Sequence, residues 1–403
     1  MSPARHIYFN KTYIACFFIL GLFPVVPFSA KPFLLGPLAL VSIFRLFFKP
    51  LQNIDWKMAL ANTGIFIVFL YSMFYSDNSG QASKQIIRLL PFLVLPFSFT
   101  LVPPEIYEKA KQLFFRVFTI GCGLFCILVF VYAYWLQSDD IGYIYSYISW
   151  HLWGYREHPI YISLYLGIAL IILLYFPKKT PLNIVLSVLI LFTLFFLTRK
   201  GNLISLFLVG TIGVFLHKNE FFSRQSLRHL AVFGIVLAGA VIIFDNYIFT
   251  RFQEIFIAQE WYDTSTSTGI RNTVLKVCTD LSFERPFWGY GLGDVQDDIN
   301  KRLIELGHEN LTTIHQYNAH NQYMQTALSS GYIGLVLFLM ILFVDIKKII
   351  TTKNKLALSV FLYIIFCFTF ESLLERQNGA IVAAIFINLF IFSPKNENNH
   401  HQP

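Results

Sequence analysis

Repeated apolar runs constrain this chain more than any other feature of its sequence. They fall at about 13–30, 33–48, 58–75, 86–102, 113–136, 159–176, 181–198, 202–217, 229–248, 326–345, 356–374 and 378–393. A helix of about 20 apolar residues crosses the hydrocarbon core of a bilayer, so the pattern predicts roughly twelve spans. Only 13% of the residues are charged, whereas about a quarter are in a soluble domain. We therefore expect an all-α, polytopic membrane protein.

Lys and Arg are unevenly divided between alternate loops, which predicts the orientation of the chain. The positive-inside rule assigns the loops that are rich in these residues, and both termini, to the cytoplasm. These loops hold Arg5, Lys11, Arg45, Lys49, Lys57, Lys109, Lys111, Arg116, Lys178, Lys179, Lys218, Arg224, Arg228, Lys347, Lys348, Lys353, Lys355 and Lys395. The opposite short loops hold only Lys31, Lys84, Arg88, Arg156, Arg199, Lys200 and Arg376.

Three regions follow from this orientation. Residues 1–248 are expected to contain spans one to nine, and residues 326–403 spans ten to twelve with a cytoplasmic tail. Residues 249–325 between them form a large loop on the non-cytoplasmic face. The net charge of +8 is spread between the apolar runs rather than gathered in one patch. It therefore predicts contact with membrane lipids and no nucleic-acid partner.

Two cations lie at a predicted turn on the non-cytoplasmic face. The flanking runs are both held at the cytoplasmic side by Lys178, Lys179 and Lys218, so Arg199 and Lys200 must face outward. This placement opposes the orientation rule. Either the two side chains extend to lipid headgroups, or they bind a phosphate-bearing lipid, since a guanidinium matches phosphate oxygens.

The large loop begins with a predicted amphipathic helix. Its apolar residues recur at helical spacing, at Ile270, Val274, Val277 and Leu281, and they predict one buried stripe. Thr268 is the expected N-cap, which places Arg271 in the first turn. A glycine-rich run with Arg285 follows and ends the helix. It predicts a tight turn rather than a dinucleotide site, because no βαβ unit surrounds it.

Asp294 is expected to cap a second helix in the loop, which ends at Gly307. The run Asn318-Ala319-His320-Asn321 then leads into span ten. We place His320 in the first turn of that span. There the partial positive charge of the helix N-terminus favours a neutral imidazole that can act as a base, although a lone histidine is more often structural.

Other polar residues are weaker signals. His308, His315 and His320 do not have a metal-ligand spacing, and no Cys or carboxylate completes a site, so no metal is predicted. Glu371 lies at the rim of span eleven and is a functional candidate, as intramembrane carboxylates generally are. Arg88, Asp245, Glu375 and Arg376 are further residues of this kind, and Arg376 fits a solvated turn best. Four of the five cysteines lie in apolar runs and are expected to act as small hydrophobic residues.

Together, in this order, these residues resemble the O-antigen ligase and O-antigen polymerase family of bacterial inner-membrane glycosyltransferases. The resemblance covers roughly the second half of the chain. It rests on Thr198-Arg199-Lys200-Gly201, Gly269-Ile270-Arg271, the run Pro286 to Gly293, Ala319-His320-Asn321-Gln322-Tyr323, Gly331 and Gly334, and Glu371 with Gly379. The chain has Arg-Lys-Gly where family members often have Arg-Gly or Arg-Ala, which adds one cation.

The resemblance implies a GT-C-like fold and a reaction on the periplasmic face of the bacterial inner membrane. The donor would be a glycan on undecaprenyl diphosphate, and the acceptor a hydroxyl of lipid A–core. His320 would match the family's proposed general base, and Arg271 and Arg199 the arginines thought to hold the pyrophosphate. Lys200 would assist them, and Arg285, Asn321 and Glu371 are further candidate helpers. The family's mechanism requires no cofactor and no metal.

Other functions remain open from the sequence. A polymerase would use the same chemistry with a second lipid-linked glycan as acceptor, and a protein acceptor is a third choice. A transporter or flippase is the alternative from another class. Such proteins commonly show repeat symmetry and broken spans with charges at the midplane, whereas the polar candidates here gather at one face.

Overall fold

The computed structural model describes residues 3–47, 54–136, 157–176, 180–197, 199–216, 262–313 and 317–394. Every regular element within these ranges is helical, which confirms the all-α prediction. The predicted span at 229–248, with Asp245, lies outside the described residues, as do residues 249–261 of the predicted loop and the end of the tail.

The helices before the loop begin near the N-terminus and continue to residue 216. They are α1 (Pro3–Gly21), the 3-10 helix η1 (Phe28–Leu35), α2 (Gly36–Leu46), α3 (Trp56–Met73), α4 (Ser79–Leu89), α5 (Pro91–Thr100), α6 (Pro104–Leu136), α8 (Pro159–Tyr175), α9 (Pro181–Leu197) and α10 (Lys200–Leu216). The loop and the C-terminal part contain α14 (Ser267–Glu284), α15 (Val295–Glu305), α16 (Asn310–Thr313), α17 (Gln322–Thr351), α18 (Lys355–Phe370), η3 (Leu373–Glu375) and α19 (Gln377–Ile391).

Among the described residues, five helical segments are long and apolar enough to cross a membrane. They are Phe28–Leu46, Trp56–Met73, Ser79–Thr100, Pro104–Val131 and Gln322–Thr351. Five shorter apolar helices, α8, α9, α10, α18 and α19, accompany them. These helices support a membrane protein, and the count of twelve spans stays a prediction.

Proline divides two of the predicted apolar runs. The run at 13–30 is interrupted after Gly21, and Pro24 and Pro27 lie in the gap before η1. The run at 86–102 is divided where α5 begins at Pro91. Proline has no backbone N–H and its ring clashes with the preceding turn, so a helix can break within a run whose hydropathy is continuous.

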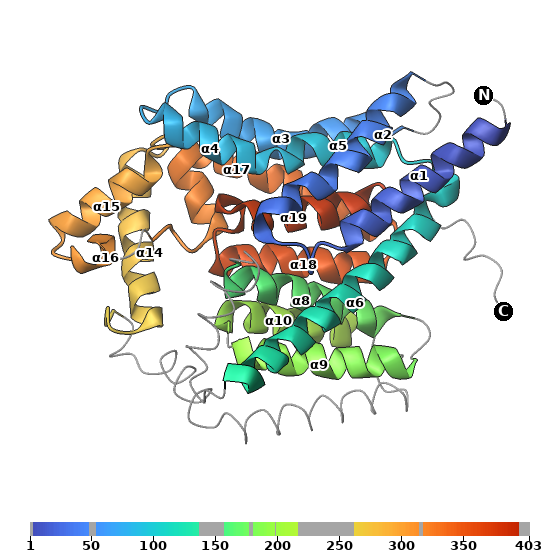
Figure 1. Ribbon diagram of the computed structural model, residues 1–403. Coiled ribbons are helices and arrows are strands. Elements are labelled where there is room, and N and C mark those ends of the chain that lie inside the picture. Colours follow the sequence, from blue (N-terminus) through green and yellow to red (C-terminus); the bar gives the residue numbers. More distant parts are fainter. Residues whose placement is uncertain are drawn as a thin grey trace.

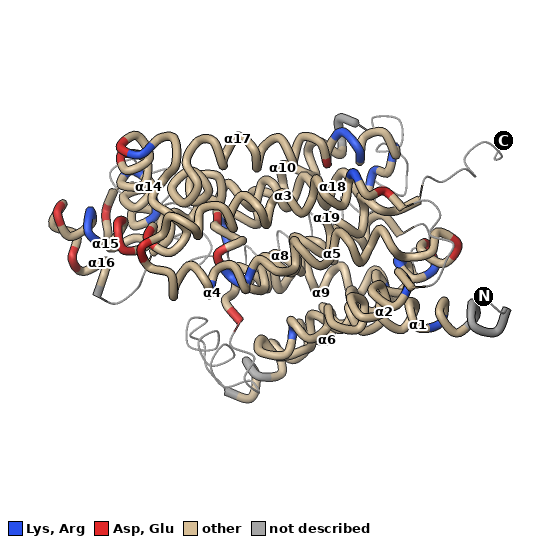
Figure 2. Tube along the Cα trace, turned by 90° about the horizontal axis from the view of Figure 1, so that it is seen from above, with Lys and Arg blue, Asp and Glu red and all other residues tan. Residues whose placement is uncertain are grey.

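The long helices lie roughly parallel, and α14 crosses them at one end (Figure 1). The start of α1 lies at the opposite end, and α15 and α16 lie outside α14. Lys, Arg, Asp and Glu gather toward the two ends, while long stretches between them are uncharged (Figure 2). This arrangement matches a bundle with an apolar middle and two polar ends.

The loop region is fastened to the helix bundle by Asp294. Its side chain does not cap α15, as the sequence predicted. It accepts hydrogen bonds from Ser76 Oγ at 2.6 Å, Asp77 N at 2.9 Å and Asn78 N at 2.8 Å instead. The carboxylate therefore satisfies backbone groups just before α4 and holds that turn against the start of α15. Gly307 ends α15 with a φ of 78°, as expected.

Candidate functional site

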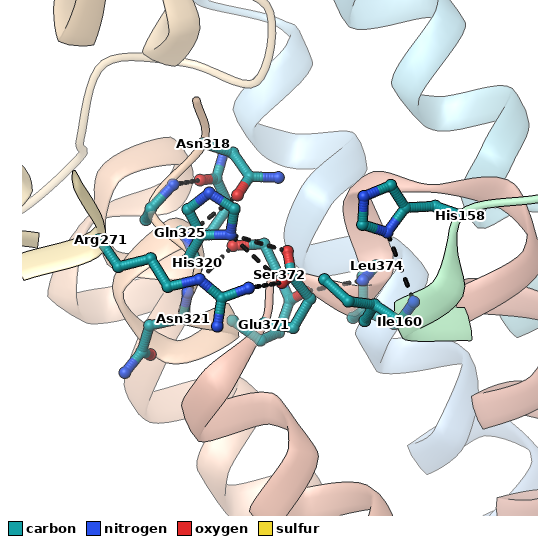
Figure 3. A network of polar contacts seen from close by, with 12 residues as sticks. His158, Ile160, Arg271, Asn318, His320, Asn321, Gln325, Glu371, Ser372 and Leu374 are labelled. Atoms are coloured by element: carbon teal, nitrogen blue, oxygen red, sulfur yellow. Dashed lines mark hydrogen bonds and ion pairs between the residues drawn. The ribbon is translucent and has the colours of Figure 1, made fainter. Parts of the chain in front are cut away.

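Glu371, directly after α18, is the centre of a polar group formed by three separate elements (Figure 3). His320, just before α17, places Nδ1 at 3.1 Å and 3.2 Å from the two carboxylate oxygens. Arg271 of α14 places Nη2 at 3.4 Å from Glu371 Oε2. The Glu371 side chain is 6% exposed and that of Arg271 is 32% exposed. A buried carboxylate is thus shared by a histidine and an arginine.

His320 does not lie in the first helical turn, which corrects the sequence prediction. Helix α17 begins at Gln322, and Asn321 is its N-cap, with Oδ1 accepting from Met324 N at 3.0 Å. His320 precedes the cap with a φ of 46°, in the left-handed region that non-glycine residues seldom occupy. Its backbone N–H donates to Asn318 Oδ1 at 3.0 Å. The helix terminus therefore sets the position of His320 through the preceding backbone.

The turn that carries Glu371 is held from two sides. Asn321 N donates to Ser372 Oγ at 3.2 Å, and Leu374 N donates to Gln322 Oε1 at 2.7 Å. From α4, Arg88 Nη1 donates to the carbonyl oxygen of Glu375 at 3.0 Å. These bonds join residues far apart in sequence, so no local pattern could have identified Gln322 as part of the site.

The charges around Glu371 favour its ionised form. Burial raises the pKa of the carboxyl, but the nearby His320 and Arg271 outweigh burial, so the pKa is lowered overall. Since a carboxylate can only accept, Nδ1 of His320 donates to it. In the neutral tautomer the lone pair is then on Nε2. That atom is buried and has no hydrogen-bond partner among the described residues.

His158 is a member of this neighbourhood that the sequence analysis missed. It is the N-cap of α8, where Nδ1 accepts from Ile160 N at 3.4 Å. Partial burial of the imidazole lowers its pKa to about 4, and the positive charge of Arg199 lowers it further, although His158 keeps an exposed surface. A single histidine before a proline gives no signal for such a site, because the effect comes from residues distant in the chain.

Arg199 and Lys200 reach the same end of the bundle from the start of α10. Lys200 Nζ donates to Thr268 Oγ1 at 3.0 Å, which joins α10 to the first turn of α14. Thr268 is therefore not the N-cap. Thr266 is the cap, with Oγ1 accepting from Gly269 N at 3.0 Å, so Arg271 lies two residues further along α14 than predicted, in its second turn. Arg199 is near enough to His158 to lower its pKa.

Arg285 is not brought to this group. It follows α14 at the far end from Arg271, and fourteen residues at 1.5 Å rise each separate the two by about 21 Å. Its guanidinium lies 4.7 Å over the Tyr290 ring. Asn321 takes part as a helix cap rather than through contact with Glu371.

Two hollows in the described part of the chain lie away from these side chains. A hollow of about 600 Å³ lies at the far end of α14, and one of about 220 Å³ lies between α10 and α18. Neither is lined by Arg271, His320 or Glu371. The side chains of His320 and Arg271 each contact Glu371 directly. Within the described ranges, no cluster of three His, Cys, Asp or Glu residues could hold a metal ion.

Comparison with known proteins agrees with the resemblance seen in the sequence. Residues 184–339 match the family described as O-antigen ligase. The match includes Arg199, Arg271 and His320 and ends before Glu371. The chain is also 24% identical over 418 aligned positions to an uncharacterized protein of Haemophilus influenzae, and the alignment covers 98% of each chain.

Proposed function

Because the domain at residues 184–339 is of the O-antigen ligase family, we propose that the chain transfers a glycan from undecaprenyl diphosphate to an acceptor hydroxyl of lipid A–core. The main support is the arrangement of His320, whose Nδ1 contacts Glu371 while Nε2 has no partner in the described structure. A histidine fixed on one side by a carboxylate, with a lone pair on the other side, suits proton abstraction.

The proposed reaction begins at the acceptor hydroxyl. Nε2 of His320 takes the hydroxyl proton as the oxygen attacks the anomeric carbon of the donor sugar. The imidazolium that forms is stabilised by Glu371, as a carboxylate stabilises the histidine of other acid–base sites. The C–O bond to undecaprenyl diphosphate breaks, and a new glycosidic bond forms in its place.

The leaving diphosphate gains negative charge in the transition state. Arg271 and Arg199, with Lys200, would place positive charge where that charge develops, and charges already in position stabilise the transition state without reorganisation. In the structure Arg271 contacts Glu371. A diphosphate that pairs with Arg271 would draw the guanidinium away from Glu371, so that the carboxylate interacts with His320 alone. Binding of the donor would in this way strengthen His320 as a base.

The setting follows from the same family. We place the protein in the bacterial inner membrane, with both termini cytoplasmic and the loop of residues 249–325 periplasmic. Its partners are the lipid-linked donor, the glycan acceptor and membrane lipids. A polymerase is the alternative, with the same residues and a second lipid-linked glycan as acceptor.

The test uses the full chain in lipid nanodiscs with a glycan on undecaprenyl diphosphate and separate candidate acceptors. His320→Ala is expected to lower kcat by about 10²–10⁴-fold, the usual contribution of a general base. Arg271→Ala is expected to lower it by about 10²–10³-fold through lost charge stabilisation. Lys276→Gln, also on α14, is the matched control and should behave as wild type.

The acceptor that is glycosylated decides between the alternatives. Transfer to lipid A–core supports the ligase, and transfer only to a second lipid-linked glycan supports the polymerase. Full activity in folded His320→Ala and Arg271→Ala would disprove the site assignment. Absence of transfer to any acceptor would favour a transporter.

A further inference from the structure

The segment after α14 is held rigidly against α17. Tyr290 N donates to Leu328 O at 2.7 Å, and Tyr332 N donates to Pro286 O at 2.6 Å. Gly331 has a φ of 68°, and a Cβ there would lie 2.0 Å from Phe287 O, so only glycine permits this approach. Side chains on this segment are therefore displayed from a fixed backbone.

Two large aromatic side chains on this rigid segment face outward. Phe287 is 67% exposed and Trp288 is 56% exposed. The Trp288 ring lies 5.9 Å from that of Tyr71, near the end of α3, and Tyr75 hydrogen-bonds to the carbonyl oxygen of Trp288. The aromatic residues thus lie at the end of α3 where α14 crosses the bundle.

This aromatic patch continues the outward face of two candidate spans. On α3 the exposed residues Leu60, Ile67 and Tyr71 recur at helical spacing, and the exposed C-cap Phe74 continues the stripe. On α17 the exposed residues include Val336, Met340 and Phe343. Apolar faces of membrane spans contact lipid tails, and Trp and Tyr gather where the tails meet the headgroups. Phe287 and Trp288 lie at that level because they lie at the end of the α3 stripe.

A hollow of about 600 Å³ opens beside these two rings. Arg285 lines it, with its guanidinium 4.7 Å over the Tyr290 ring. No carboxylate of the described chain forms an ion pair with Arg285. Its neighbour Glu284 also lines the hollow, but that carboxylate pairs with Arg302 at 2.7 Å. The hollow therefore presents the exposed Arg285 cation beside two exposed aromatic rings.

We propose that this hollow binds the headgroup of an anionic membrane phospholipid. Arg285 donates to the phosphate, as guanidinium groups do in phosphate sites, and Phe287 and Trp288 lie at the boundary between headgroups and acyl chains. The acyl chains continue along the exposed stripe of α3. This lipid would fix the end of α14 that lies about 21 Å from Arg271 and so hold the helix along the membrane surface. The proposal does not depend on the reaction proposed above.

The first experiment locates Phe287 relative to the bilayer. All five native cysteines are buried, so an introduced cysteine can be labelled selectively with a nitroxide. Phe287→Cys is compared with Leu306→Cys, which is also exposed, at the end of α15, in vesicles of phosphatidylethanolamine and phosphatidylglycerol. We expect collisions with oxygen, which concentrates in lipid, to dominate at 287, and collisions with a water-soluble nickel chelate to dominate at 306. Dominant nickel collisions at 287 would overturn the proposal.

The second experiment tests the headgroup. The full chain is released from the same vesicles and its retained lipids are counted by native mass spectrometry. Wild type and the control Lys301→Gln should retain phosphatidylglycerol, and Arg285→Gln should lose it. Arg285→Lys, which keeps the charge without the planar fork, should show intermediate retention. Equal retention by folded Arg285→Gln, or displacement of the lipid by a soluble oligosaccharide, would contradict lipid binding at this hollow.

Discussion

Glu371 and Glu375 lie four residues apart in the turn between α18 and α19, yet their surroundings shift the pKa values of the two carboxyl groups in opposite directions. For Glu371, burial raises the pKa, but His320 and Arg271 lower it further than burial raises it. For Glu375, burial dominates and raises the pKa from 4.5 to about 7, with only partial compensation from Arg88 and Arg376. One turn thus holds a carboxyl whose ionised form is favoured and a carboxyl that changes charge near neutral pH.

The raised pKa of Glu375 makes a pH-dependent contribution to stability. The folded protein binds this proton more tightly than the unfolded chain does, so the contribution is present below pH 4.5 and is lost as the pH rises through about 7. Glu375→Gln, which stays neutral, removes the dependence. We expect the unfolding free energy of the variant, relative to wild type, to increase as the pH rises through this range.

Chemical unfolding in detergent micelles measures the unfolding free energy of both proteins at each pH. Subtracting the wild-type value from that of the variant cancels the contributions of the titratable groups that both proteins share. Glu305→Gln, which removes an exposed carboxylate on α15 far from this turn in sequence, is the control variant. A flat difference for Glu375→Gln would show that Glu375 is ionised throughout.

The sequence singled out Arg271, His320 and Glu371 individually but not their contact. Glu371 is 51 residues from His320 and 100 from Arg271, and such a distance gives no local signal. His158 was missed for the same reason, since its low pKa comes from packing. The predicted position of His320 in the first helical turn was wrong, because Asn321 is the N-cap of α17 and His320 precedes it.

At the scale of the elements, the apolar runs predicted which segments are helical better than where the helices end. Helix α6 begins at Pro104, well before the predicted run at 113, because its first turns are amphipathic rather than uniformly apolar. Prolines at 24 and 91 lie inside apolar runs, which hydropathy alone does not divide. Hydropathy records burial in lipid, whereas helix ends depend on backbone hydrogen bonds.

Helices α3 and α17 are joined by a buried polar pair that the sequence did not reveal. Asn62 Nδ2 donates to Asp345 Oδ1 at 3.0 Å. The remaining oxygens, Asn62 Oδ1 and Asp345 Oδ2, are buried without a partner among the described residues. An unsatisfied buried polar group costs about 1–3 kcal/mol, so this pair leaves two buried acceptors without a donor among the described residues.

Asp345→Asn would supply the missing donor to Asn62 Oδ1. We expect the free energy of unfolding to be kept or raised by about 1 kcal/mol, the usual net value of a hydrogen bond. Asp345→Ala leaves Asn62 without a partner and should lower it by about 1–3 kcal/mol. Denaturant unfolding of both variants in the same detergent measures this. If Asp345→Asn lowers the free energy of unfolding as much as Asp345→Ala does, the carboxyl group itself is required.

The whole molecule combines a bundle with an uncharged middle and a helical cover at one end. Figure 2 shows the charged residues gathered mainly toward both ends, in agreement with the membrane class predicted from hydropathy. The position of α14 across the bundle depends on tertiary bonds, such as Lys200 to Thr268, that no pattern in the sequence encodes. The sidedness of the two ends remains a prediction from the distribution of Lys and Arg.

That sidedness can be tested because all five native cysteines are buried. Leu306→Cys lies on the loop side and Thr351→Cys at the other end of α17, and both positions are exposed. The positive-inside rule places 351 in the cytoplasm, beside Lys347, Lys348, Lys353 and Lys355. A membrane-impermeant maleimide applied to spheroplasts should therefore label 306 at once and 351 only after lysis. The wild-type chain, which has only the five buried native cysteines, should stay unlabelled both before and after lysis. Labelling of 351 before lysis would invert the topology and move the His320 site to the cytoplasmic face, where a periplasmic transfer could not occur.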